Sequence, residues 1–290
     1  MHLQRVTIVG MGLIGGSIAR DLKERKLVHS IIGVDQEIKH LEFAKEKGWI
    51  DRAIVEIKQE VVEVELVLLT TPLAALTSIL QSLSQLSLPE TVVISDVGST
   101  KANVIEAFRT HLPQHFDCCL AGHPLAGRER SGIQYAELDL FMGQKVVLCP
   151  HERQKTASLM LLSQFWRDLG AQVYEVPAEL HDQIVAMTSH FPHLLAYVFM
   201  NQLAKSELKG AYLEFAGSGF RDFTRIAAGD PELWMQICIQ NRTFLLELLQ
   251  QYRGALDICE EALKKADKKA LKGYFSTSQK IRSRWGRAKK

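Results

Sequence analysis

Residues 6–17 read VTIVGMGLIGGS, and the run IIGVD, which ends at Asp35, follows one helix-length later. The β-branched residues Val6–Val9 predict a buried strand. Gly10, Gly12 and Gly15 then match the pattern G-x-G-x-x-G at the start of a predicted helix. In order, these glycines permit a tight turn, the approach of a pyrophosphate to the backbone, and close packing of the helix on the strand.

The start of this helix predicts a dinucleotide site. Free N–H groups there favour a phosphate, and Asp35 is the acid expected about twenty residues after the third glycine, where it binds a ribose. A carboxylate suits the free 2′-hydroxyl of NAD and repels the 2′-phosphate of NADP, although Lys39 and His40 weaken this preference. The alternative is a glycine-rich turn of another α/β fold. We expect NAD, with candidate residues Gly10, Gly12, Leu13, Ile14, Gly15, Asp35, Thr71 and Pro72.

The composition is typical of a globular protein with a sizeable core. The 290 residues suffice for one large domain or two ordinary ones. The net charge of +2 indicates no polyanionic partner such as nucleic acid. Six basic residues and no acid lie within 280–290; this tail either contacts an anion or is a solvated terminus.

The five cysteines contain no C-x-x-C pair, so we expect reduced thiols in a cytoplasmic protein and no metal site. The first predicted strand leaves no room for a signal peptide. No apolar run is long enough to span a bilayer, so no membrane association is expected.

The first part of the chain alternates strands and helices. Predicted helices such as Ile14–Arg25 and Lys101–His111 separate strands rich in β-branched residues. This pattern indicates a doubly wound parallel α/β sheet, the Rossmann architecture, over residues 1–177. The predicted strands are Arg5–Val9, Ser30–Val34, Leu66–Thr70, Thr91–Ser95, Cys118–Ala121, Lys145–Leu148 and Gln172–Val176.

Past the sheet no strand is predicted. Glu179–Ala204 and Pro231–Tyr252 carry apolar residues at helical spacing, and Asp230 is a good N-cap for the second of them. That second helix is apolar on more than one face and needs partners on several sides. We expect an all-helical domain over residues 178–290 that either forms a homodimer interface or is a self-contained bundle.

Two loops at strand ends carry candidate chemistry. His123 lies in GHPLAG, directly after an apolar run, where a doubly wound sheet binds ligands. There it can act as a base or hydrogen-bond acceptor, or only cap a turn. Ser99 can bond a substrate hydroxyl, N-cap the helix that starts near Lys101, or both. We expect Asp96 to hold its loop rather than to react.

A third candidate segment lies in the first helix of the second domain. Ser189, His190 and His193 project within about one turn of one another. Pro192 cannot donate to the carbonyl of Thr188, so the helix should bend and free a polar group. Such a kink suits the lining of a pocket better than a core, and no carboxylate stands at the spacing that a metal site would need.

Two arginines, Arg221 and Arg225, follow in a glycine-rich stretch. Arginine is the preferred fork for a carboxylate, but either residue can instead pair with Asp222 or Asp230. Spacing does not decide between them.

Five segments occur in the order VGMGLIGGS, SDVGSTK, GHPLAGRERSG, SHFPH and GFRDFTRIAAGDPELW. Over essentially its whole length the chain resembles the prephenate dehydrogenases of the prephenate/arogenate dehydrogenase family. The later segments are not shared by generic Rossmann enzymes. The departures are small: Ser218 stands where a third glycine is common, and Leu125 stands where methionine is common.

The resemblance implies an NAD-dependent homodimer that oxidatively decarboxylates prephenate to 4-hydroxyphenylpyruvate in tyrosine biosynthesis. It implies that His123 accepts a hydrogen bond from the ring hydroxyl and that Ser99 assists there. Arg225 would bind a substrate carboxylate, with Glu129 as its ionic partner near the entrance. The other implied pocket residues are Ser189, His190, His193 and Trp234, the last of which reaches the neighbouring subunit's site in the family's dimers.

Three alternatives compete with this assignment. An arogenate-preferring or dual-specificity cyclohexadienyl dehydrogenase stays open, because no residue distinguishes the amino from the keto group. A β-hydroxyacid dehydrogenase or imine reductase would rely on a catalytic lysine in the helical domain, for which no matching motif is present. A catalytically inactive NAD-binding or dimerisation module would be indicated by loss of His123, Ser99 or Arg225, and all three are present.

Overall fold

The computed structural model describes residues 2–126 and 132–287. Spatial contacts group the chain into two compact units, Met1–Asn241 and Arg242–Lys290. This grouping joins the helices that precede residue 242 to the sheet. The sequence predicts a domain boundary after residue 177, because the predicted strands end there. The contact grouping does not test that boundary, which stays a prediction.

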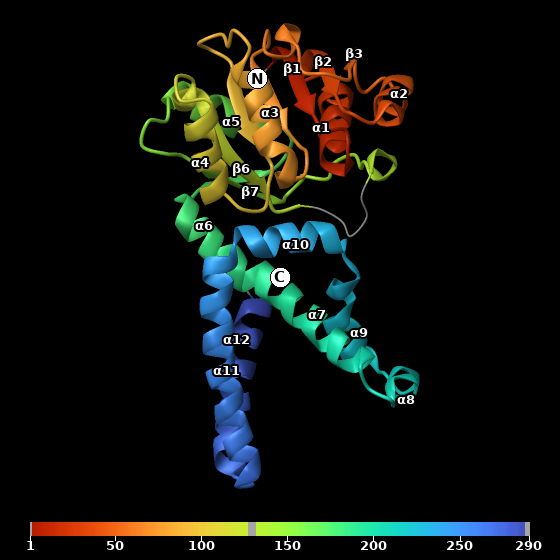
Figure 1. Ribbon diagram of the computed structural model, residues 1–290, viewed down its shortest axis with the longest axis vertical. Coiled ribbons are helices and arrows are strands. Elements are labelled where there is room, and N and C mark those ends of the chain that lie inside the picture. The colour runs from red at the N-terminus through yellow and green to blue at the C-terminus, as the bar shows by residue number, and fades with distance from the viewer. Residues whose placement is uncertain (1, 127–131, 288–290) are drawn as a thin grey trace. The chain divides into compact units, whose positions relative to one another are not determined.

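An eight-stranded sheet forms the centre of the first unit (Figure 1), in the order β3-β2-β1-β4-β5-β6-β7-β8. Neighbours are parallel from β3 through β6, β7 runs antiparallel to β6, and β8 is parallel to β7. The predicted doubly wound sheet is therefore confirmed, with β3 as an additional edge strand. The strands are β1 Leu3–Val9, β2 Val28–Val34, β3 Arg52–Ile54, β4 Leu66–Leu69, β5 Val93–Asp96, β6 Cys119–Pro124, β7 Lys145–Cys149 and β8 Gln172–Glu175.

Helices bury both faces of this sheet, which explains the continuous apolar runs in its strands. One face packs on helices α1 (Leu13–Glu24), α2 (Ile38–Glu46) and α5 (Thr156–Asp168). The other packs on α3 (Leu76–Ser84) and α4 (Ala102–His111). In β1 the side chains of Ile8 and Val9 enter these two cores in turn. Thr7, which precedes them in β1 and is also buried, donates its hydroxyl to the Val61 carbonyl at 2.8 Å.

In the structure, the first helix predicted beyond the sheet is divided into three segments. Helix α6 (Ala178–Val185) passes into a π-helical turn (Ala186–His190) and then into α7 (Phe191–Ala204). Pro192 lies in the first turn of α7, where its missing N–H does least harm. The irregularity expected here is thus a π-helical turn, a feature that is frequent at functional sites.

Three short segments follow α7: α8 (Lys209–Glu214), α9 (Ser218–Thr224) and the 3₁₀ turn η6 (Arg225–Ala228). They lead to α10 (Pro231–Gln240), whose first turn is capped by Asp230, which accepts from the Glu232 amide at 2.9 Å. The prediction of one helix over Pro231–Tyr252 is wrong. Helix α10 ends at Gln240, the buried Asn241 interrupts it, and a new helix begins at Arg242.

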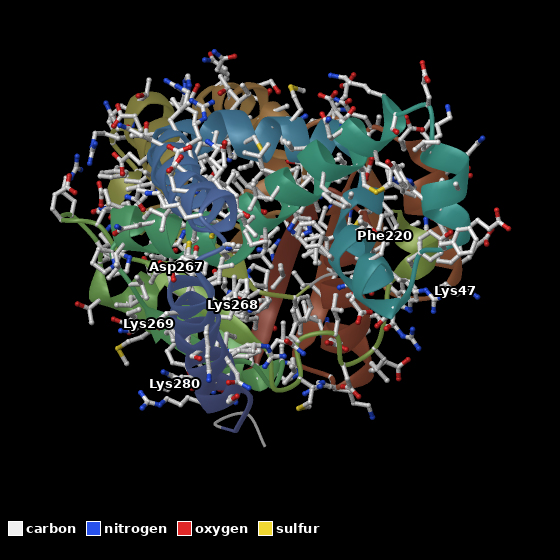
Figure 2. The ribbon with its side chains drawn as sticks, turned by 90° about the horizontal axis from the view of Figure 1, so that it is seen from below. Lys47, Phe220, Asp267, Lys268, Lys269 and Lys280 are labelled. Carbon is white, nitrogen blue, oxygen red and sulfur yellow. The ribbon has the colours of Figure 1, made fainter. Side chains whose placement is uncertain are left out.

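The second unit is a pair of helices, α11 (Arg242–Lys264) and α12 (Lys268–Arg287), that pack on each other (Figure 1). Asp267 caps α12 by accepting from the amides of Lys269 and Ala270 at 3.0 and 2.9 Å. Lys268, Lys269 and Lys280 of α12 are exposed (Figure 2). Large apolar side chains are exposed beside them, including Leu263, Phe275, Ile281 and Trp285. No helix within the described residues is both long and apolar enough to cross a membrane.

Candidate active site

The glycine turn lies at the carboxyl end of β1. Gly10 adopts a φ of +100°, which is strained for any other residue. Thr70, after β4, donates its hydroxyl to the Gly10 carbonyl at 2.5 Å. A Cβ at Gly15 would stand 2.0 Å from that carbonyl oxygen, so helix and strand approach each other as the motif predicts.

Gly12 behaves differently from its neighbours. It precedes α1 with a φ of −83°, and a Cβ built on it would meet no described atom within 4 Å. The missing side chain therefore keeps a space open over the first amide groups of α1, in the field of the helix dipole. This open space fits the pyrophosphate of a dinucleotide.

Asp35, at the end of β2, is tied to the glycine turn. Its Oδ2 accepts from the Met11 amide at 2.7 Å and its Oδ1 from the Glu37 amide at 2.8 Å. Nδ1 of His40 lies 3.3 Å from Oδ2. Of the other predicted cofactor residues, Leu13 and Ile14 open α1. Thr71 adjoins Gly10, since its methyl group would lie 2.8 Å from a Cβ there, and the exposed Pro72 follows it.

A buried ion pair joins the ends of β5 and β6. Nζ of Lys101 lies 2.5 Å from Oδ2 of Asp96 and 2.7 Å from the Gly122 carbonyl, and the two side chains are 0% and 3% exposed. Asp96 also accepts from the amides of Gly98 and Gly122. Asp96 therefore holds its loop, as predicted, and Lys101 anchors the residue that precedes His123.

His123 ends a directed chain of hydrogen bonds. Its Nδ1 lies 2.9 Å from Nε2 of His181, whose Nδ1 lies 2.8 Å from Oδ1 of Asp182. A carboxylate accepts, so Nδ1 of His181 donates, and when this ring carries a single proton its Nε2 holds the lone pair. Nδ1 of His123 must then donate to His181. The chain leaves Nε2 of His123 as a hydrogen-bond acceptor.

Burial and the charge of Lys101 keep the ring of His123 neutral. The pKa of His123 lies well below its usual 6.5, because the ring is removed from water and because the charge of Lys101 adds repulsion against a second proton. A neutral imidazole is what an acceptor at this position requires.

Ser99 lies half-buried on the loop between β5 and α4. The prediction that it N-caps α4 is wrong, because the carboxylate of Asp182 accepts from the amides of Lys101 and Ala102 at 2.8 and 3.0 Å. Asp182 thus fastens α6 to the start of α4 as well as orienting His181. The other role predicted for Ser99, at a substrate hydroxyl, stays a prediction.

The predicted pocket residues of the helical segment lie together. Ser189 and His190 belong to the π-helical turn, and His193 belongs to the first turn of α7. Nδ1 of His193 donates to the Ser189 carbonyl at 2.9 Å. The His193 ring stacks on Trp234 of the same chain with centroids 3.6 Å apart, whereas the resemblance implied that Trp234 serves the neighbouring subunit.

His190 is the most deeply buried of these residues, at 1% exposure. Its Nδ1 lies 3.0 Å from Nδ2 of Asn241. Burial lowers the pKa of His190 from 6.5 to about 4, and the carboxylate of Asp182 opposes this shift. The ring is therefore neutral at physiological pH.

The predicted carboxylate fork is only partly described. Arg225 is exposed on η6, which packs against α7, and Arg221 lies on α9. Glu129, the predicted partner of Arg225, lies outside the described residues.

Sequence reasoning missed His181, Asp182 and Asn241, and it gave Lys101 no role beyond the start of a helix. The adjacent His–Asp pair near the start of a predicted helix was the available signal for the first two. Nothing in the local pattern marks Asn241, because the apolar spacing continues past it.

Comparisons with known proteins give matches over both parts of the chain. The family model described as "Prephenate dehydrogenase, nucleotide-binding domain" matches residues 18–175, and "Prephenate dehydrogenase, dimerization domain" matches residues 177–277. A cyclohexadienyl dehydrogenase of Zymomonas mobilis is 31% identical over 281 residues, which are 96% of this chain and 95% of that protein.

Solved structures match over the same span. A prephenate dehydrogenase from A. aeolicus, in complex with hydroxyphenyl propionate and NAD+, has a TM-score of 0.91 at 29% identity and covers 98% of this chain and 99% of its own. An arogenate dehydrogenase from Synechocystis has a TM-score of 0.83 at 30% identity, with 97% and 100% covered. The chain therefore belongs to the prephenate dehydrogenase family, a family of oxidoreductases.

Proposed function

We propose that the protein oxidatively decarboxylates prephenate to 4-hydroxyphenylpyruvate with NAD, in tyrosine biosynthesis. The observation that carries this proposal is the chain Asp182–His181–His123, which ends in a neutral acceptor, Nε2 of His123. Strands β1 and β6 run in the same direction, so this acceptor lies at the same edge of the sheet as the glycine turn.

The chain's own features support NAD as the cofactor. The open space at Gly12 would take the pyrophosphate, and Asp35 would bind the ribose 2′-hydroxyl. When bound, NAD supplies the acceptor for a hydride.

The chemistry left to the protein is alignment and polarisation. The substrate loses a hydride from the ring carbon that bears its hydroxyl, and the bond to the ring carboxylate breaks to release carbon dioxide. The electron pair of that bond completes the aromatic ring, and the hydroxyl stays on the product as a phenol. Nε2 of His123 accepts the hydrogen bond of this hydroxyl and draws its proton while positive charge develops on the carbon.

Two carboxylates make the substrate a dianion, which needs cationic or hydrogen-bonding partners. We assign one carboxylate to Arg225, with Glu129 as the ionic partner of that arginine. Ser99 would assist at the hydroxyl. The remaining pocket would be formed by Ser189, His190, His193 and Trp234, three of which lie together around the start of α7.

Arogenate is the second candidate substrate. Relatives that span nearly the whole chain include a cyclohexadienyl dehydrogenase and an arogenate dehydrogenase. The fold alone therefore does not distinguish prephenate, which carries a keto group, from arogenate, which carries an amino group. Comparing kcat/KM for prephenate and arogenate, each with NAD and with NADP, tests the assignment through the absorbance of the reduced nicotinamide. We expect prephenate with NAD to give the highest value. Turnover of arogenate without turnover of prephenate would refute it.

We also propose a homodimer. The matched dimerization domain and the apolar side chains exposed on α11 and α12 support this assembly. Burial of such a surface is the main driving force of association between copies of a chain.

A further inference from the structure

Asn241 is a buried polar residue at a helix break. It separates α10 from α11 and is 3% exposed, although the apolar pattern on either side would allow one continuous helix. A buried amide is costly unless it is hydrogen bonded, so its partners define its role.

The first partner fixes the orientation of the Asn241 amide. Nδ2 lies 2.9 Å from the main-chain carbonyl of Asp182, which can only accept. The amide of Ala186 donates to the same oxygen at the start of the π-helical turn, and a carbonyl has lone pairs for both donors. A flipped amide would set Oδ1 against this carbonyl, so the orientation with Nδ2 facing Asp182 is the stable one.

The second partner is then determined. Nδ2 carries two hydrogens, and the one not given to Asp182 is available to Nδ1 of His190, 3.0 Å away. Nδ1 must therefore accept, which leaves the hydrogen of the neutral ring on Nε2. A proton on Nδ1 would bring two donors together.

The rings of His123 and His190 thus have opposite tautomers. Asp182 acts on both: its side chain, through His181, makes Nε2 of His123 an acceptor, and its carbonyl orients the amide that makes Nε2 of His190 a donor.

We propose that Asn241 is a positioning residue that holds His190 as an Nε2–H donor to an anionic oxygen of the substrate. The identity of the ligand rests on the proposed function, whereas the tautomer does not. A donor that stays neutral binds an oxygen without placing a positive charge beside His123. Such a charge would alter the ability of His123 to accept a hydrogen bond.

Ring spectra of nitrogen-15-labelled histidine test the tautomer, with the His190 signal assigned from its loss in His190→Gln. We expect an Nε2–H imidazole in the wild type. In Asn241→Asp the carboxylate accepts instead of donating, so the ring should switch to Nδ1–H or become doubly protonated. Asn241→Ala, which removes the donor without adding a charge, should give a mixture of the two neutral tautomers of His190. This variant also provides the test if Asn241→Asp does not fold.

The matched control is Asn201→Asp. Asn201 is exposed on α7, and its Nδ2 donates to the Tyr197 carbonyl at 2.9 Å, the same contact without a histidine. Its substitution should leave the His190 spectrum and ligand binding unchanged. A wild-type His190 with Nδ1–H, or an unaltered spectrum in both Asn241 variants, would overturn the proposal.

Binding and kinetics test the donor role. Loss of a hydrogen bond to a charged group should weaken calorimetric binding of 4-hydroxyphenylpyruvate about tenfold in Asn241→Asp and raise KM by a similar factor, with kcat within about twofold. A loss confined to kcat would contradict a positioning role at the substrate. If the wild type oxidises neither prephenate nor arogenate, the proposed function fails, while the ring spectra still decide the role of Asn241.

Discussion

At the scale of single residues, Gly12 and Gly15 serve different purposes in one motif. Gly15 is required by the fold, because a Cβ there would stand 2.0 Å from the Gly10 carbonyl. The fold does not require Gly12 in this way, because a Cβ there meets open space at an ordinary φ, and we propose that the ligand requires it. The same substitution at the two positions should therefore separate stability from cofactor binding.

We expect Gly15→Ala to destabilise the protein by about 1–3 kcal/mol or more through overpacking. Gly12→Ala should keep the wild-type Tm and weaken NAD binding at least about tenfold. Thermal unfolding and NAD titration of both variants are the measurements. Equal Tm values for the two variants, or wild-type NAD affinity in Gly12→Ala, would contradict this division.

The buried His190 makes stability depend on pH. Its pKa is about 4 in the folded chain against 6.5 ordinarily, so the unfolded chain binds more protons between these values and folding weakens as the pH falls through them. The loss from this ring should reach about 1.4 kcal/mol at a pH of about 5.5. Urea unfolding at about pH 7.5 and 5.5 should show a smaller pH dependence in His190→Gln than in the wild type. An identical pH dependence of the free energy of unfolding in both proteins would contradict the assignment to His190.

At the scale of elements, the ion pair of Lys101 and Asp96 joins the loops that end β5 and β6. Both side chains are removed from water, so deleting one partner leaves an uncompensated charge. We expect Lys101→Met to lower the free energy of unfolding by about 3–5 kcal/mol.

The matched control for this pair is Lys23→Met. Lys23 and Asp51 are 22% and 41% exposed, and a surface pair contributes about 0–1 kcal/mol. Urea unfolding of both variants gives the comparison. A Lys101 variant as stable as the Lys23 variant would show that the buried pair does not hold these loops.

Helical periodicity predicts the helices of the second half but not their breaks. Apolar spacing continues through Asn241, whose helix propensity is only modestly unfavourable, so local pattern gives one helix where there are two. The contacts that break it come from α6 and the π-helical turn, 59 and 51 residues away in the chain. Pro192 did mark the other irregularity, because its effect is local.

At the scale of the whole molecule, the candidate site gathers residues from distant parts of the sequence. The glycine turn, Asp35 and the strand ends were predictable, since one supersecondary unit contains the first two and parallel strands share an edge. The chain from His123 to His181 was not, because it joins residues 58 apart through tertiary packing. The cap of α4 was not predictable either, because Asp182, a residue distant in sequence, accepts from its first amides where the local pattern suggested Ser99.

The proposed assembly is tested at this scale. Light scattering during size-exclusion chromatography should give twice the 32.7 kDa chain mass. Ile281→Asp, at a 66% exposed apolar position of α12, should shift the mass toward the monomer, whereas Lys280→Asp at the neighbouring exposed position should not. A monomeric wild type would refute the homodimer.

The proposed reaction depends above all on Nε2 of His123, which would accept from the hydroxyl of the substrate that NAD oxidises. Its most direct test is turnover of prephenate by His123→Asn, followed through the reduced nicotinamide, with NAD binding measured on the same preparation. We expect kcat to fall about 10²–10⁴-fold, the typical contribution of a positioned acid–base group, with unchanged NAD affinity. Near-normal turnover of prephenate by this variant would contradict it.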